Sequence, residues 1–316
     1  MVFTRRSFSK TLCCHLPLVI GSLSFKPNLL EAQPLNKPTS GSELGLNTWS
    51  LRSLKKDRAI PTIVKVMKET GMRNCQLLFS HAEPEEFDPD FAAMFSANGT
   101  APTQQERDAQ KRKSEARTAW RLSVPMTYFE AIRTRFVRQG LWIRSYGSSF
   151  GATLEEVDRV FLMAKTLGAT VVNGRLPETQ TDMVAAAAQR HGLFAGIQVS
   201  DPQILKLQLR ASPNLSADPD LGDLTKAGVS ALEFVKEHLG RISSIDLKDA
   251  MIKGGSVPFG TGDAHMREVL EFLSRNSSPV EIYIDCDYPG TGNSTSEVKR
   301  CVCYIRELIS ASCRGH

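Results

Sequence analysis

Three short stretches of sequence decide the fold: LSADPD at residues 215–220, ISSIDL at 242–247 and VEIYIDCD at 280–287. Each is a short, largely apolar run that ends in or near acidic residues, and segments with the spacing of amphipathic helices separate them. Short apolar runs between helices are typical of parallel strands that are buried on both faces. The three stretches therefore predict parallel strands joined by helices.

The same alternation extends outward through the chain and predicts eight strands in all, at residues 44–49, 74–79, 141–145, 169–173, 194–199, 215–220, 242–247 and 280–287. Eight strand–helix units in one chain of this length predict a single (β/α)₈ TIM barrel over residues 44–312. The main alternative is a doubly wound open sheet, which usually carries a glycine-rich fingerprint after its first strand. Residues 49–52 read WSLR instead. Residues 84–121 interrupt the alternation, and 106–121 are expected to form a charged, exposed helix.

The N-terminus is typical of an export signal. Residues 4–10 read TRRSFSK, a twin-arginine pattern, and a moderately apolar run and a small residue, Ala32, follow. We therefore expect residues 1–32 to be a twin-arginine signal that directs the protein to the periplasm, and the polar residues 33–43 to be a linker. The apolar run is too short and too interrupted for stable membrane insertion.

The composition is that of a globular protein and gives no indication of nucleic-acid binding. The chain has 316 residues, of which 41% are hydrophobic and 23% charged, as in ordinary globular proteins. Most of the net charge of +5 lies in the first 32 residues, so the body is close to neutral and carries no electrostatic signature of a nucleic-acid-binding protein. Beyond the signal lie five cysteines without CxxC spacing, which we interpret as structural thiols. The five cysteines are Cys75, Cys286, Cys301, Cys303 and Cys313. Oxidation of one pair of them after export remains open.

Acidic residues gather at the ends of the last three predicted strands, where a barrel of this class builds its active site. Asp285 and Asp287 are two residues apart, so they share one face of a strand. Several inward carboxylates repel one another unless a cation joins them, and an all-oxygen set suits Mg²⁺ or Mn²⁺. We predict Asp220, Asp246 and Asp285 as metal ligands. The alternative is that a lysine, Lys248, neutralises these groups in plain salt bridges.

Four segments together resemble a known family: LGDLTKAG at 221–228, RISSIDLKD at 241–249, VPFGTGD at 257–263 and IDCDYP at 284–289. The chain is similar over roughly residues 44–311 to the sugar phosphate isomerase/epimerase family, whose members have a xylose isomerase-like barrel. The resemblance implies metal-assisted isomerisation or epimerisation of a sugar, in which a divalent ion polarises a carbonyl and a protein base moves a proton at the neighbouring carbon.

The chain departs from the family pattern at the expected ligand positions. Histidines of the family pattern are replaced at Asp223, Ser244 and Asp246, and glutamates of the last strand are replaced by the shorter Asp285 and Asp287. Two interpretations remain open. In one, the site is altered but still binds Mg²⁺ or Mn²⁺ through an all-oxygen set; in the other, the barrel has lost its metal and survives as a non-catalytic carbohydrate-binding protein.

The remaining candidates complete the predicted site. Lys248, His81 and Asp287 are expected to help in catalysis, although a loop histidine such as His81 can equally be a capping or surface group. Trp49, Gln198 and Tyr288 lie at strand ends and are expected to contact the substrate, a small-molecule carbohydrate. The sequence leaves open whether the protein forms a homo-oligomer.

Overall fold

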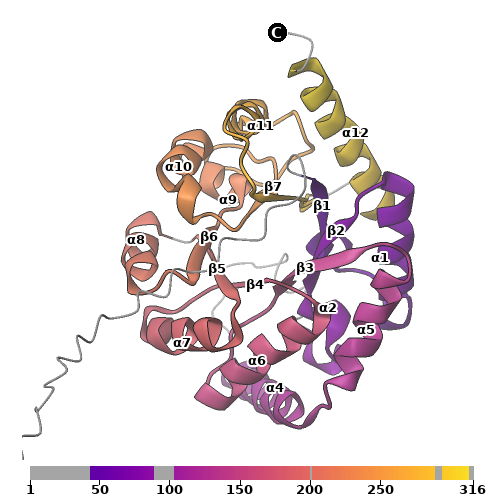
Figure 1. The fold of residues 1–316 in the computed structure, drawn as a ribbon, viewed down its shortest axis with the longest axis vertical. Coiled ribbons are helices and arrows are strands. Elements are labelled where there is room, and N and C mark those ends of the chain that lie inside the picture. The colour runs from indigo at the N-terminus through magenta and orange to yellow at the C-terminus, as the bar shows by residue number, and fades with distance from the viewer. Residues whose placement is uncertain (1–42, 89–102, 200, 289–293, 313–316) are drawn as a thin grey trace, which may run out of the picture. The chain divides into compact units, whose positions relative to one another are not determined.

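The barrel is built from eight parallel strands. A computed structural model of the protein describes residues 43–88, 103–199, 201–288 and 294–312. The strands are β1 (Leu44–Asn47), β2 (Asn74–Leu78), β3 (Trp142–Gly147), β4 (Val171–Gly174), β5 (Phe194–Gln198), β6 (Leu215–Asp218), β7 (Ser244–Leu247) and β8 (Glu281–Ile284). They pair in the order β6-β5-β4-β3-β2-β1-β8-β7. Figure 1 shows the strands at the centre with helices around them.

The gap between β6 and β7 is bridged, so the sheet closes on itself. Parallel bridges join Ala217 to Ile242 and Asp220 to Asp246. Two backbone hydrogen bonds support them: Ser243 N–H donates to the Ala217 carbonyl at 3.0 Å, and Asp246 N–H to the Pro219 carbonyl at 3.0 Å. The prediction of a (β/α)₈ barrel is confirmed, and the open doubly wound sheet is excluded.

The helices follow the strands as the sequence predicted. They are α1 (Lys56–Thr70), α2 (Phe79–Ala82), α4 (Gln104–Ser123), α5 (Thr127–Val137), α6 (Leu154–Leu167), α7 (Thr181–His191), α8 (Pro202–Ala211), α9 (Leu221–Lys226), α10 (Ala231–His238), α11 (Met266–Arg275) and α12 (Ser294–Ser312). Helices α1, α6 and α7 end at Gly71, Gly168 and Gly192, each in the left-handed conformation that glycine adopts without strain. Short 3₁₀ turns occupy Thr48–Leu51, Glu85–Phe87, Glu178–Gln180 and Leu239–Arg241.

Helix α4 is mostly exposed, as the sequence predicted, with one exception. Arg121 near its end is fully buried and holds the helix to the barrel. The Arg121 guanidinium lies 2.7 Å from Glu83 and 3.0 Å from Glu156, and Tyr146 donates to Glu83 at 2.7 Å. Arg117 adds a second contact to Glu83 at 2.6 Å. A charged helix can therefore pack on the barrel because its buried charges are paired and hydrogen-bonded.

Some expectations fall on residues that the structure does not describe. The export signal at 1–32 and nearly all of the linker at 33–43 are among them, as is Cys313. Within the described ranges, no helix is both long and apolar enough to cross a bilayer.

Candidate functional site

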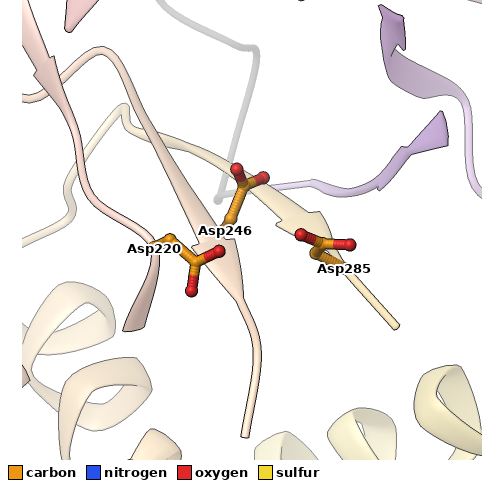
Figure 2. A group of neighbouring side chains, drawn as sticks. All are labelled: Asp220, Asp246 and Asp285. Atoms are coloured by element: carbon orange, nitrogen blue, oxygen red, sulfur yellow. The ribbon is translucent and has the colours of Figure 1, made fainter. Parts of the chain in front are cut away.

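Three aspartates from neighbouring segments come together at the carboxyl ends of the strands. Asp220 follows β6 and caps the N-terminus of α9, where it accepts a hydrogen bond of 2.9 Å from Asp223 N–H. Asp246 lies within β7, and Asp285 directly follows β8. One oxygen of each carboxylate lies within 4.8 Å of the others. Figure 2 shows the three side chains beside one another, each from its own segment. The structure thus brings together the three residues that the sequence singled out.

Lys248 lies in the same cluster and touches three carboxylates. Its ammonium is 2.5 Å from Asp220, 3.1 Å from Asp285 and 3.6 Å from Asp287. The side chain is almost fully buried. Gly222, at the start of α9, leaves the space for its stem, since a Cβ there would lie 2.7 Å from Lys248 Cγ. The lysine therefore supplies a fixed positive charge inside the acidic cluster.

Asp287 connects the cluster to the 3₁₀ turn that follows β1. Its carboxylate lies 2.7 Å from the Arg52 guanidinium, in addition to its longer contact with Lys248. Arg52 in turn lies over the ring of Trp49, with its guanidinium carbon 5.1 Å from the ring centroid, and donates to the Trp49 carbonyl at 3.1 Å. Arg52 was not singled out from the sequence, because a lone arginine in a turn gives no signal of its own. The fold alone brings it to Asp287.

The cluster carries more negative than positive charge. Asp220, Asp246, Asp285 and Asp287 contribute four negative charges when all are ionised, and Lys248 and Arg52 contribute two positive charges. In this fully ionised state two negative charges are left over, and one divalent cation would balance them.

Two of these carboxyl groups have raised pKa values, and burial is the largest cause of both shifts. Burial, followed by repulsion from Asp218, Asp285 and Asp220, raises the pKa of Asp246 well above its usual range. Burial also raises the pKa of Asp285 to about 7, although Lys248 opposes the shift. Burial opposes the charge on Lys248, but the surrounding carboxylates outweigh it and raise the pKa of this amine well above its usual value. Lys248 is therefore an ammonium at neutral pH.

A second polar layer lies below the cluster inside the barrel. Asn47 donates to Asp246 at 3.0 Å, and Ser244 donates to Asp218 at 2.5 Å. The amide of Asn173 donates to Ser244 at 2.9 Å and to Gln76 at 2.8 Å. Asp218 was not selected from the sequence, although it stands two residues before Asp220, the spacing that places strand residues on one face.

Some polar atoms in these layers are buried without a partner. Among the described residues, Asp285 Oδ1, Asp218 Oδ2 and Asn173 Oδ1 have no hydrogen-bond partner. Buried polar atoms are nearly always paired, so each such atom calls for an explanation. Of these three atoms only Asp285 Oδ1 belongs to the acidic trio, and a carboxylate oxygen is the kind of atom that a hard cation takes as a ligand.

The other predicted residues lie outside the cluster. His81 is buried in α2, where Nδ1 is 3.0 Å from Thr48 Oγ1 and Nε2 is 3.2 Å from the Leu51 carbonyl. Burial lowers its pKa to about 4, so its ring is neutral at pH 7. Because both nitrogens are engaged, the capping interpretation fits this histidine better than a catalytic one.

The two remaining substrate candidates have different surroundings. Gln198 ends β5 and is paired in register with Asp218, so it lies next to the polar layer. Tyr288 follows β8, and its hydroxyl donates to Glu297 of α12 at 3.0 Å. Its polar end is thus directed at a helix of the outer ring.

Asp249 connects two of the sequence motifs, RISSIDLKD at 241–249 and VPFGTGD at 257–263. Its carboxylate accepts hydrogen bonds from four backbone N–H groups, at 2.8 to 3.3 Å, of which two belong to Gly260 and Gly262 in the VPFGTGD segment. A Cβ at Gly262 would lie 2.4 Å from Asp249 Oδ1. The pair of adjacent residues therefore has two roles: Lys248 enters the acidic cluster, while Asp249 fixes the loop that follows.

Comparison with known proteins gives the fold a context. No family model matches the chain, and no curated protein matches it in sequence. Among solved structures, a xylose isomerase domain protein from Planctomyces limnophilus is similar, with a TM-score of 0.59 and 13% identity over 88% of this chain and 99% of that one. A sugar phosphate isomerase/epimerase from Parabacteroides distasonis ATCC 8503 gives 0.58 and 13%, covering 84% and 96% of the two chains.

A third similar structure is an L-ribulose 3-epimerase, with a TM-score of 0.58 and 9% identity over 87% of this chain and 96% of that one. The fold is that of the xylose isomerase-like barrels. This fold agrees with the resemblance that the sequence motifs indicated.

Proposed function

We propose that the protein is a divalent-cation-dependent isomerase or epimerase of a sugar or sugar derivative, with Asp220, Asp246 and Asp285 as the cation ligands. The observation that carries this proposal is the acidic trio itself: three carboxylates within 4.8 Å, one of them with a buried oxygen that has no partner among the described residues. When all four carboxylates are ionised, a divalent ion would balance the two negative charges that Lys248 and Arg52 leave. The donors are all oxygens, which favours Mg²⁺ or Mn²⁺ over softer metals.

The proposed chemistry follows from the position of each side chain. When bound, the cation would hold adjacent sugar oxygens and polarise a carbonyl. Lys248, an ammonium at neutral pH, stabilises the negative charge that develops on the substrate oxygen when a proton leaves the neighbouring carbon. Asp287 is more accessible than Asp285, with 13% against 4% of its side chain exposed, so we assign it the role of the base that takes the proton. Trp49, beside Arg52, and Gln198 would contact the sugar.

One observation favours a second candidate function. Lys248 already touches three carboxylates, and an ammonium can replace a metal ion as the counter-charge of an acidic cluster. In that case the barrel would bind a carbohydrate through the same mouth without a cation and without catalysis. For either function we propose the periplasm as the location, on the basis of the twin-arginine pattern in residues 4–10.

Proton exchange at carbon distinguishes the two functions. The protein is incubated with a panel of aldoses and ketoses in D₂O, with Mn²⁺ or with a chelator, and deuterium incorporation next to the carbonyl is followed by NMR. We expect incorporation into at least one sugar, dependent on Mn²⁺ and abolished by Asp246→Asn. The matched control is Asp182→Asn, an exposed aspartate on α7, which should leave the rate unchanged. Sugar binding without any exchange would support the non-catalytic function instead.

A further inference from the structure

Two cysteine sulfurs meet beside the acidic cluster. Cys286 lies between Asp285 and Asp287 after β8, and Cys301 lies on α12, the helix that packs beside β8. Their Sγ atoms are 3.0 Å apart, and both residues are buried. A disulfide bond has a length of about 2.0 Å, so a movement of roughly 1 Å converts this contact into a bond.

Hydrogen bonds besides the sulfur contact hold the segment of Cys286 in place and join it to α12. Ser50 Oγ accepts from Cys286 N–H at 2.8 Å and also donates to the Ile284 carbonyl at 3.3 Å, which fixes the segment that follows β8. The Tyr288 hydroxyl donates to Glu297 of α12 at 3.0 Å and lies 3.5 Å from Cys301 Sγ. The two thiols therefore face each other because strand and helix are already held together.

We propose that Cys286 and Cys301 form an intrachain disulfide that fixes the Asp285–Asp287 segment to α12. The pair is selective among the cysteines that the structure describes: Cys75 is buried elsewhere and Cys303 is exposed. The bond would hold two of the four carboxylates of the cluster in place. The proposal does not rest on a cation or a substrate, so it can fail or succeed independently of the proposed function.

The oxidation is a thiol–disulfide exchange with an oxidised low-molecular-weight disulfide or a protein disulfide as electron acceptor. The thiolate of one of the two cysteines attacks one sulfur of the acceptor and releases the other as a thiol. The second cysteine then attacks the sulfur of the first in this mixed disulfide, forms the bond between Cys286 and Cys301 and releases the second thiol. The two protons of the cysteines end on the two released thiols, and the acceptor takes up two electrons.

The test is chemical mapping of the full chain. The protein is equilibrated in a buffer of oxidised and reduced glutathione, the remaining thiols are alkylated, and the digest is analysed by mass spectrometry. We expect a peptide pair joined through Cys286 and Cys301, and a loss of two titratable thiols from the seven in the chain. The oxidised form should melt roughly 5–10 °C above the reduced form, because the bond closes a loop between residues 15 positions apart and so restricts the unfolded chain.

Single-cysteine variants make the assignment specific. Cys301→Ser should abolish the joined peptide and the melting shift, whereas Cys303→Ser, two positions along the same helix and exposed, should leave both unchanged. Glutathione on Cys303 with free thiols at 286 and 301 in the wild-type protein would overturn the proposal. So would a loss of two thiols that persists in Cys301→Ser. The mapping of the wild-type chain stands even where a variant folds poorly.

Discussion

Replacement of Lys248 by methionine tests how the acidic cluster is held together. The variant keeps most of the side-chain volume but removes a buried ammonium that lies 2.5 Å from Asp220, 3.1 Å from the buried Asp285 and 3.6 Å from Asp287. One such contact near 3 Å is worth on the order of 5 kcal/mol at an effective dielectric constant of about 20, before desolvation is subtracted. Removing one partner of a buried ion pair typically costs about 3–5 kcal/mol. We expect a loss of this size in the free energy of unfolding at pH 8.

The loss should depend on pH in a direction that the pKa shifts define. The pKa of Asp285 is already raised to about 7 by burial, with Lys248 opposing the shift. Without the lysine this pKa rises further, so protonation relieves the repulsion among the carboxylates at low pH. The destabilisation by Lys248→Met should therefore be large at pH 8 and considerably smaller at pH 5.

Urea denaturation with a chelator present, at both pH values, measures these free energies. The control is Lys206→Met, which removes an exposed ion pair with Glu237 at 3.3 Å and should cost less than about 1 kcal/mol. A Lys248→Met variant that loses less than about 1 kcal/mol at pH 8, or the same amount at both pH values, would refute the reasoning. Mn²⁺ should restore part of the loss, since a ligand at 100 times its Kd stabilises the folded state by about 2.7 kcal/mol.

Three further predictions concern the surroundings of the cluster. Gly222→Ala places a Cβ 2.7 Å from Lys248 Cγ and should lower the free energy of unfolding by about 1–3 kcal/mol. The control Gly240→Ala, with open space around the added Cβ, should leave this free energy nearly unchanged, and equal melting temperatures of the two variants would contradict the prediction. Burial lowers the pKa of His81 to about 4 in the folded protein, so as the pH falls the unfolded chain binds the proton before the folded one does. The free energy of unfolding should therefore fall by about 3 kcal/mol from pH 6.5 to 4. His81→Gln should lose that part of the pH dependence, and an unchanged slope would show that other groups cause it. Asp249→Asn weakens four backbone hydrogen bonds and should lower the free energy of unfolding by about 2–4 kcal/mol. Amide hydrogens in the loop that Asp249 holds should exchange faster, and unchanged protection there would contradict the assigned role.

Local patterns were sufficient to predict the barrel and its acidic rim. The alternation of short apolar runs with helices predicted eight parallel strands, and strand-end positions predicted that Asp220, Asp246 and Asp285 would lie together. These inferences succeed because the carboxyl ends of parallel strands meet at one edge of the barrel.

Long-range contacts were not accessible in the same way. The sequence suggested that Lys248 could neutralise the aspartates, but which carboxylates it contacts depends on the path of its side chain past Gly222. The burial of Arg121 depends on a partner, Glu83, that lies 38 residues away. The engaged ring of His81 depends on Thr48 and Leu51. No periodicity or spacing encodes which of several charged residues meet in three dimensions.

Calorimetric titration with Mn²⁺ measures whether the acidic cluster binds a divalent cation beside Lys248. We expect one ion per chain, and binding near pH 7 should release protons from Asp246 and Asp285, so that the measured enthalpy changes with the ionisation enthalpy of the buffer. Asp246→Asn should weaken binding by at least about 100-fold, and Asp182→Asn should not. Absence of binding to the wild-type protein, or equal binding by Asp246→Asn, would contradict the account.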